Sequence, residues 1–302
     1  MKDVESLGSI FIGGGTPSTL ELSYYEQIFK ELKRFDKNIE ITIEANPTAT
    51  YEWLNGIKKY VNRISFGVQS FDETKLKFLG RNHSGNMAEK AVKNASNVGF
   101  INISLDLIYD TKLDTKELIE SDLSKAFSLP INHISCYSLT LEEKTKFFKQ
   151  TSYKVDNYEL TKFLFDKIKK HGFKQYEISN FGSYESSHNK GYWEYKEYIG
   201  VGSGAVGFRD NTRYYNHKNL EKYIASPLEY ELENLDTHSI LIEKIFLGLR
   251  SIIGLSKDIL DIQQLKRVQI LLEENKIKEV NGIVFNNDFL LADELALFIT
   301  QS

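Results

Sequence analysis

Three consecutive glycines near the start of the chain have the character of a ligand-binding loop. Gly13–Gly15 follow a short apolar segment, Ser9–Ile12, and precede Thr16 and a helical pattern that opens at Leu20. Glycine lets the backbone turn tightly and approach a ligand closely, and the free N–H groups of a helix start attract negative charge. The loop is therefore predicted to cradle a ligand.

Polar side chains stand at the carboxyl ends of three further apolar segments: Glu44 and Asn46, Gln69, and Asp106. In folds built from strand–helix repeats this edge carries the site, because side chains there point into its mouth. Any one of these residues can instead cap the helix that follows it. Several such positions on different strands favour a shared binding site over separate caps.

The single cysteine, Cys136, restricts the metal chemistry of the chain. It excludes an internal disulfide, a CxxC zinc site and a cluster held by cysteines of this chain alone. Cys136 lies inside an apolar strand pattern, where a buried small side chain is the usual role of a free cysteine. No metal site is therefore predicted from these residues.

A strand–loop–helix unit repeats through the first half of the chain and would position the polar residues. The strands are short and almost continuously apolar, which suits parallel strands covered on both faces. They cover Ser9–Ile12, Glu40–Ala45, Arg63–Val68, Asn102–Tyr109, His133–Leu139 and Lys174–Ser179, with helical patterns over 24–35, 51–60, 86–100, 116–129 and 158–173. This order predicts an α/β fold, either a βα barrel or an open doubly wound sheet.

The remainder of the chain differs in composition and in its pattern of elements. Residues 181–236 begin with a stretch dense in Gly, Tyr and Asn, whose aromatic content argues against disorder. Residues 237–302 form a small helical unit with a hairpin that turns at Asn281-Gly282. This unit resembles a winged helix, but its seven basic and nine acidic residues oppose DNA binding. We predict a barrel over 1–180, a connecting region over 181–236 and a structural C-terminal domain over 237–302.

The overall charge and the absence of targeting signals narrow the partners and the compartment. The 302 residues include 38 basic and 42 acidic side chains, a net charge of −4. That balance gives no reason to expect a nucleic-acid partner. The sequence has no apolar run long enough to span a membrane and no recognisable signal peptide, so we expect a cytoplasmic protein.

Several segments in order resemble one known family. They read FIGGGTPS, ITIEANP, RISFGVQSF, LGRNHS, NISLDLIY, HISCYSLTLE, YEISNF, HNKGYW and YIGVGSGAVG. Together they are similar to radical SAM proteins related to oxygen-independent coproporphyrinogen III oxidase, and HNKGYW resembles the HemW branch of heme chaperones. The resemblance covers nearly the whole chain. It implies an incomplete parallel (β/α)6 barrel with a small, helical, winged-helix-like C-terminal domain.

The resemblance implies a site for S-adenosylmethionine. The glycine loop and Glu44 would approach the methionine end of this cofactor, and Gln69 and Asp106 would meet the ribose hydroxyls. Arg81 would pair with the methionine carboxylate, which suits a guanidinium fork. The implied cofactor-binding residues are Gly13, Gly14, Gly15, Thr16, Glu44, Gln69, Arg81 and Asp106.

Two departures from the family bear on its chemistry. The family carries a CxxxCxxC loop after its first barrel strand, and its thiolates hold a [4Fe–4S] cluster. This sequence starts at what resembles the second strand, and we hypothesise that it is an N-terminally shortened version of a longer protein. The segment Tyr109–Thr115 stands where relatives have a Gly-Leu-Pro-Gly turn, so its backbone is expected to run differently.

The heme chaperone branch also implies a heme ligand and a protein that accepts the heme. Among the six histidines, His188 is the candidate, because Asn189, Tyr192 and Trp193 follow it and aromatic rings stack on a porphyrin face. A hydrogen bond that stabilises the loop is the alternative role for His188. The acceptor is unknown, and one associated with a membrane would fit.

The leading hypothesis is a heme chaperone that binds heme and S-adenosylmethionine on a radical SAM scaffold. One alternative is a coproporphyrinogen III oxidase in porphyrin biosynthesis, which needs an upstream CxxxCxxC segment. Another is a protein that only binds S-adenosylmethionine and uses no cluster. Whether the protein is an enzyme stays open at this point.

Overall fold

The computed structural model describes residues 6–32, 35–141 and 148–301. The chain divides into two compact units, Met1–His188 and Asn189–Ser302. Residues 33–34, within the first predicted helix, and Glu142, which ends the HISCYSLTLE segment, lie outside the described residues. The predicted three-part division at residues 180 and 236 stays a prediction.

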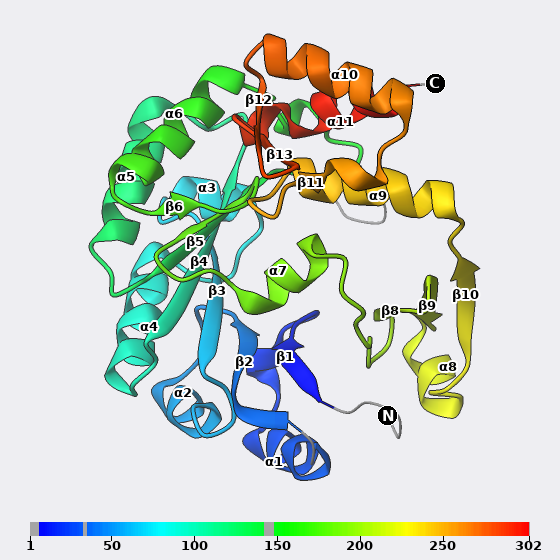
Figure 1. The fold of residues 1–302 in the computed structure, drawn as a ribbon. Helices are drawn as coiled ribbons and strands as arrows, with labels where there is room; N and C mark the ends of the chain where they lie inside the picture. The colour runs from blue at the N-terminus through cyan, green and yellow to red at the C-terminus, as the bar shows by residue number, and fades with distance from the viewer. Residues whose placement is uncertain (1–5, 33–34, 142–147, 302) are drawn as a thin grey trace. The chain divides into compact units, whose positions relative to one another are not determined.

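The first unit is built around one curved sheet with strand order β1-β2-β3-β4-β5-β7-β6 (Figure 1). Strands β1 to β5 pair in parallel. The α/β fold and the incomplete barrel are thus confirmed. The strands are β1 (Leu7–Ile12), β2 (Phe35–Ala45), β3 (Arg63–Gln69), β4 (Asn102–Tyr109), β5 (His133–Ser138), β6 (Lys174–Gln175) and β7 (Asn180–Gly182).

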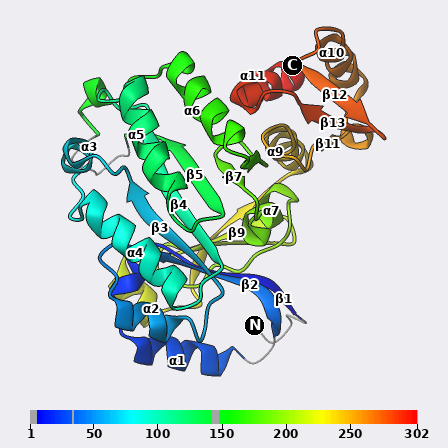
Figure 2. The same ribbon diagram turned by 90° about the vertical axis from the view of Figure 1, so that its left-hand side faces the viewer.

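Helices pack along one face of this sheet, as Figure 2 shows for α4, α5 and α6. Side-chain oxygens receive N–H groups at the starts of several helices, for example Thr50, Asp72, Ser84 and Thr115. The helices are α1 (Leu22–Glu31), α2 (Tyr51–Ile57), α3 (Glu73–Phe78), α4 (Gly85–Asn97), α5 (Lys116–Phe127) and α6 (Tyr158–Lys170).

Two predicted elements are wrong in detail. The sixth strand, predicted over Lys174–Ser179, is a short hairpin in which β7 runs antiparallel to both β5 and β6. The chain turns there because the Gln175 side chain donates to the Ile178 carbonyl and the Ser179 N–H donates to Glu177. The first helix ends at Glu31, and the chain from Phe35 pairs with β1 instead of continuing the helix.

The two faces of the sheet differ, which the apolar strand patterns did not indicate. On β2 to β5 every second residue is apolar and buried, such as Ile43, Phe66 and Leu105. The residues between them are polar and lie in register across the strands: Thr42 beside Arg63, Glu44 beside Ser65, Ser104 beside His133, and Asp106 beside Ser135. The strands are therefore less continuously apolar than predicted, because their buried apolar residues alternate with polar ones that lie on the opposite face.

The second unit contains two small antiparallel sheets. One has the order β10-β9-β8 and the other β11-β13-β12. The boundary between the units falls within α7 (Ser187–Trp193). The remaining elements are β8 (Val206–Arg209), β9 (Thr212–Asn216), α8 (Leu220–Ala225), β10 (Tyr230–Asn234), α9 (Thr237–Leu249), β11 (Leu255–Ser256), α10 (Ile262–Glu273), β12 (Ile277–Val280), β13 (Ile283–Asn286) and α11 (Ala292–Thr300).

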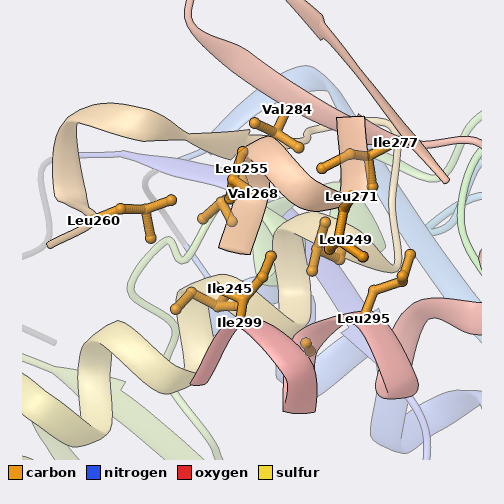
Figure 3. Close-up of a cluster of buried hydrophobic side chains, with 11 residues drawn as sticks. Ile245, Leu249, Leu255, Leu260, Val268, Leu271, Ile277, Val284, Leu295 and Ile299 are labelled. Atoms are coloured by element: carbon orange, nitrogen blue, oxygen red, sulfur yellow. The ribbon is translucent and has the colours of Figure 1, made fainter. Parts of the chain in front are cut away.

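The C-terminal part of this unit has the predicted winged-helix-like form. Helices α9, α10 and α11 enclose a core with the sheet β11-β13-β12 (Figure 3). The hairpin turns at Asn281 and Gly282, whose φ angles of 53° and 79° fit a type I′ turn. Within the described part of the chain, no helix combines the length and apolar character that crossing a bilayer requires.

Shortening a side chain in this core should destabilise the unit. Leu249 has no exposed surface, whereas Leu297 on α11 is 56% exposed. We expect Leu249→Ala to lower the free energy of unfolding by about 2–5 kcal/mol, because it leaves a cavity. Leu297→Ala is the matched control and should change it by less than about 0.5 kcal/mol. Urea denaturation followed by circular dichroism measures both, and equal losses would contradict the packing described.

Candidate functional site

The glycine loop lies at the carboxyl end of β1 and is exposed. Gly14 and Gly15 have φ angles of 76° and 57°, a left-handed backbone that favours glycine. A Cβ at Gly13 would lie 2.5 Å from the Phe11 ring and 3.1 Å from the Glu44 carboxyl carbon. Gly14 and Gly15 are therefore favoured by the backbone conformation, and Gly13 is favoured because a Cβ there would contact neighbouring side chains.

Hydrogen bonds hold the residues that directly follow the loop. A short 3-10 turn (Pro17–Thr19) follows it directly, and the first α-helix begins only at Leu22. The Asn46 N–H donates to Ser18 Oγ at 3.0 Å, and the Tyr25 hydroxyl donates to the Pro17 carbonyl at 2.7 Å. Asn46 also accepts from the Thr48 N–H at 3.0 Å, which stabilises the turn before α2, whereas the helix itself is capped by Thr50.

One carboxyl group contacts this loop, and a second lies on the same face of the sheet. Glu44 Oε2 accepts the Gly14 N–H at 3.2 Å, and Asp106 Oδ1 accepts the Ser65 hydroxyl at 3.1 Å. Burial raises the pKa of Asp106 to about 6, with a further contribution from the Glu44 charge, while Ser65 and Ser135 oppose the rise. Burial also raises the pKa of Glu44. A ligand that brings positive charge or hydroxyl donors would relieve this cost.

Gln69 and Arg81 belong to the same edge of the sheet. Gln69 has a φ of 68°, and the pairing of β3 with β4 shifts register between Phe66 and Gln69. A left-handed residue other than glycine costs about 1–3 kcal/mol, and such strain concentrates at functional sites. Arg81 is exposed. Desolvation lowers the pKa of its guanidinium, and the negative charge of Asp106 opposes that shift. The carboxylate and the guanidinium are thus electrostatically linked.

A second group of polar residues lies on the polar face of the sheet, nearer the amino ends of the strands. It was not predicted from the sequence. Its centre is Glu40, which is 5% exposed. The two carboxylate oxygens accept five donors: the hydroxyls of Thr42, Tyr184 and Ser186 and the backbone N–H groups of Ser187 and His188, at 2.7–3.2 Å. The signal for it was the period-two spacing of Glu40, Thr42 and Glu44 within a strand.

The charge of Glu40 is balanced by Arg63, which is 3% exposed. Burial alone would raise the pKa of Glu40, but Arg63 and the donors from the 184–187 segment hold it below its ordinary value. Glu40 is therefore ionised in the folded protein at neutral pH. It fixes the start of α7 to strand β2.

This arrangement holds His188. Its Nδ1 lies 2.8 Å from Ser9 Oγ, and its ring stacks on Phe11 with centroids 5.0 Å apart. Burial lowers the pKa of His188, against the raising effect of Glu40. The ring is thus largely neutral at pH 7, which a metal-binding imidazole requires. The stabilising hydrogen bond that was the alternative role is present.

The other residues of the HNKGYW segment lie on α7 with His188. Tyr192 meets Tyr198 edge to face, with ring centroids 4.8 Å apart. Arg250 lies over the Trp193 ring, 5.9 Å from its centre. Asn189 follows His188 at the start of the second unit.

Two other residues have structural roles, as was predicted for Cys136. His133 is buried, with its ring nitrogens 2.7 Å from the hydroxyls of Ser104 and Tyr176. Cys136 is buried on the apolar face, and burial raises the pKa of its thiol. In the segment that replaces the Gly-Leu-Pro-Gly turn, Asp110 takes a φ of 61°, a conformation usual for glycine.

Comparison with known proteins agrees with this architecture. Residues 1–124 match the model of the radical SAM superfamily. The structure superposes on coproporphyrinogen III oxidase (HemN) from Escherichia coli, a radical SAM enzyme, with a TM-score of 0.80 and 18% identity. That match covers 97% of this chain and 78% of the other. The fold is therefore that of a radical SAM protein.

Sequence comparison defines the family more narrowly. The chain is 36% identical over 265 residues to the heme chaperone HemW of Lactococcus lactis, which covers 82% of this chain and 70% of the relative. It is also 36% identical over 271 residues to HemW of Bacillus subtilis, covering 83% and 72%. The chain belongs to the HemW family of radical SAM proteins.

Neutralising Glu40 should destabilise the first unit. Glu40→Gln leaves Arg63 without its buried counter-charge. It also places an amide N–H₂, itself a donor, beside groups that donate to the carboxylate. Together these changes should lower the free energy of unfolding by about 3–5 kcal/mol. Because the folded-state pKa is lowered, the contribution of this charge is complete above pH 4.5 and lost as the pH falls through that pKa. Urea denaturation between pH 3.5 and about 7 tests this. The exposed Glu52→Gln is the control, and an unchanged pH profile in Glu40→Gln would refute the role.

Asp106 should behave in the opposite way. Its raised pKa means that ionisation weakens the fold, so the contribution of Asp106 to wild-type stability should fall as the pH rises from 3.8 to about 6. We expect Asp106→Asn to be more stable than wild type at neutral pH by about 1–3 kcal/mol, after allowance for partial exposure. The gain should shrink at about pH 5. Asp166→Asn, on the exposed face of α6, is the control, and a destabilised Asp106→Asn at neutral pH would contradict this account.

Proposed function

We propose that this chain binds S-adenosylmethionine and heme and acts as a heme chaperone on a radical SAM scaffold. The observation that carries the proposal is the membership of the HemW family together with the polar edge formed by the glycine loop, Glu44, Asp106 and Arg81. The protein that accepts the heme is a partner still to be found.

The residues at this edge fit S-adenosylmethionine. The loop Gly13–Thr16 is exposed and its backbone can approach a ligand closely. Glu44 and Asp106, whose pKa values are raised, would gain from the ligand's ammonium, sulfonium or ribose hydroxyl groups. Arg81 would take the methionine carboxylate through charge-assisted hydrogen bonds. When bound, the cofactor supplies a sulfonium centre.

The [4Fe–4S] cluster of the family does not fit the residues of this chain. Such a cluster needs several thiolates, and this sequence has one cysteine, Cys136. That thiol is buried and its pKa is raised, so it stays protonated. The proposal therefore contains no step that passes through a cluster.

His188 fits the role of a heme ligand. When the ring carries its proton on Nδ1 and donates it to Ser9 Oγ, the lone pair lies on Nε2, the atom that would bind iron. A hydrogen bond to the second ring nitrogen is the usual way in which proteins orient a metal-binding histidine. Stacking on Phe11 holds the plane of the ring. Bound heme would supply the iron centre that His188 ligates.

The alternative of a coproporphyrinogen oxidase is less well supported. The likeness to HemN has 18% identity and concerns the fold. The two chaperone relatives share twice that identity over more than four-fifths of this chain. Binding of S-adenosylmethionine alone would leave His188 without a ligand role, and hemin titration separates this possibility.

Separate variants should remove the two ligands independently. Hemin titration should give a shifted Soret band in the wild-type protein, and His188→Ala should lose it while His238→Ala, at an exposed histidine, keeps it. Calorimetry should show that Arg81→Ala weakens S-adenosylmethionine binding by about tenfold or more, the effect of one charge-assisted contact. Arg209→Ala, at an exposed arginine, should not. A wild-type protein that binds no hemin would overturn the chaperone proposal.

A further inference from the structure

Two donor groups of the second unit lie side by side without acceptors. Arg250, at the end of α9, covers the ring of Trp193 at 5.9 Å from its centre. Both Arg250 Nε and Trp193 Nε1 are inaccessible to solvent, and neither has a hydrogen-bond partner among the described residues. A buried N–H without an acceptor costs about 1–3 kcal/mol, more when the group is charged.

Comparable residues elsewhere in the chain are satisfied. Arg213 pairs with Glu243 at 2.6 Å, Arg209 with Asp210 at 3.3 Å, and Arg267 donates to the Ile299 carbonyl at 3.1 Å. The other tryptophan, Trp53, donates its Nε1–H to the Leu20 carbonyl at 3.0 Å. Within the described part of the second unit, Arg250 is thus the arginine that has neither a carboxylate nor a carbonyl to accept from it.

We propose that Arg250 and Trp193 form a binding site for a carboxylate group. A carboxylate has two acceptor oxygens, so it can accept from the guanidinium and from the indole N–H at the same time. The face-on contact between the two side chains alone is the simpler explanation, but it leaves both buried N–H groups unsatisfied. Since no hydrogen bond holds the Arg250 side chain, it can rotate to admit the ligand.

The site takes a propionate of heme, and this assignment rests on the proposed function. Heme carries two propionates, and Trp193 ends the HNKGYW segment whose His188 is the proposed iron ligand. The carboxylate of S-adenosylmethionine is the other source of the same chemical group. Arg250 would then fix the carboxylate through its charge.

The test separates carboxylate recognition from iron binding. Wild type, Arg250→Gln, Trp193→Phe and the control Arg209→Gln are titrated with hemin, metal-free protoporphyrin IX and the dimethyl esters of both. We expect Arg250→Gln to weaken binding of the two free acids by about tenfold to a hundredfold and to leave the esters unchanged. Trp193→Phe keeps an aromatic ring and removes the N–H. It should weaken binding of the free acids less than Arg250→Gln does, and it should also leave binding of the esters unchanged.

Each result decides the matter. A loss shared by acids and esters, or no loss, overturns the carboxylate site, as does a wild-type protein that binds esters and acids equally. A loss of S-adenosylmethionine affinity in Arg250→Gln, measured by calorimetry, assigns the carboxylate to that ligand and overturns the propionate. His188→Ala should weaken hemin binding but not binding of the metal-free porphyrin. A failure of iron ligation is therefore distinguishable from a failure of this site.

Discussion

The ionised carboxylate of Glu40 is the constraint on which the first unit depends. A buried charge is tolerated only when it is paired and hydrogen-bonded, and here the segment 184–188 supplies four of the five donors. This segment leaves β7, beside β5, and reaches β2 at the other side of the sheet, so it covers the polar face at the level of Glu40. The start of α7 and the position of His188 follow from that single carboxylate.

The same face carries two carboxylates with opposite behaviour. Arg63 lowers the pKa of both Glu40 and Asp106, so its charge does not explain the difference. Glu40 has five donors, whereas Asp106 has the hydroxyls of Ser65 and Ser135 and the nearby charge of Glu44. Asp106 is therefore left under-stabilised when ionised. A fully satisfied carboxylate builds the fold, and an under-satisfied one at the open edge is suited to a ligand.

The sequence allowed the α/β fold, most strand positions and the C-terminal hairpin to be predicted, because apolar runs and an Asn-Gly pair report local structure directly. The polar residues at the strand ends were also predictable, since parallel strands bring their carboxyl ends together. Glu40, Arg63 and Ser65 were missed because the apolar residues alternating with them dominate the pattern of a short strand. The hairpin of β6 and β7 was missed because its turn depends on side-chain hydrogen bonds of Gln175 and Glu177, which no periodicity reveals.

The two roles weighed for His188 from the sequence are not exclusive. A hydrogen bond between His188 Nδ1 and Ser9 Oγ and stacking on Phe11 stabilise the segment, and both partners lie on the strand that precedes the glycine loop. Because a serine hydroxyl both donates and accepts, this contact is compatible with the tautomer that carries its proton on Nδ1, and that tautomer leaves Nε2 for ligation. Strand β1 therefore links the two proposed ligands, because its side chains orient His188 and its carboxyl end opens into the loop at Gly13. Any movement of that strand would change both sites together.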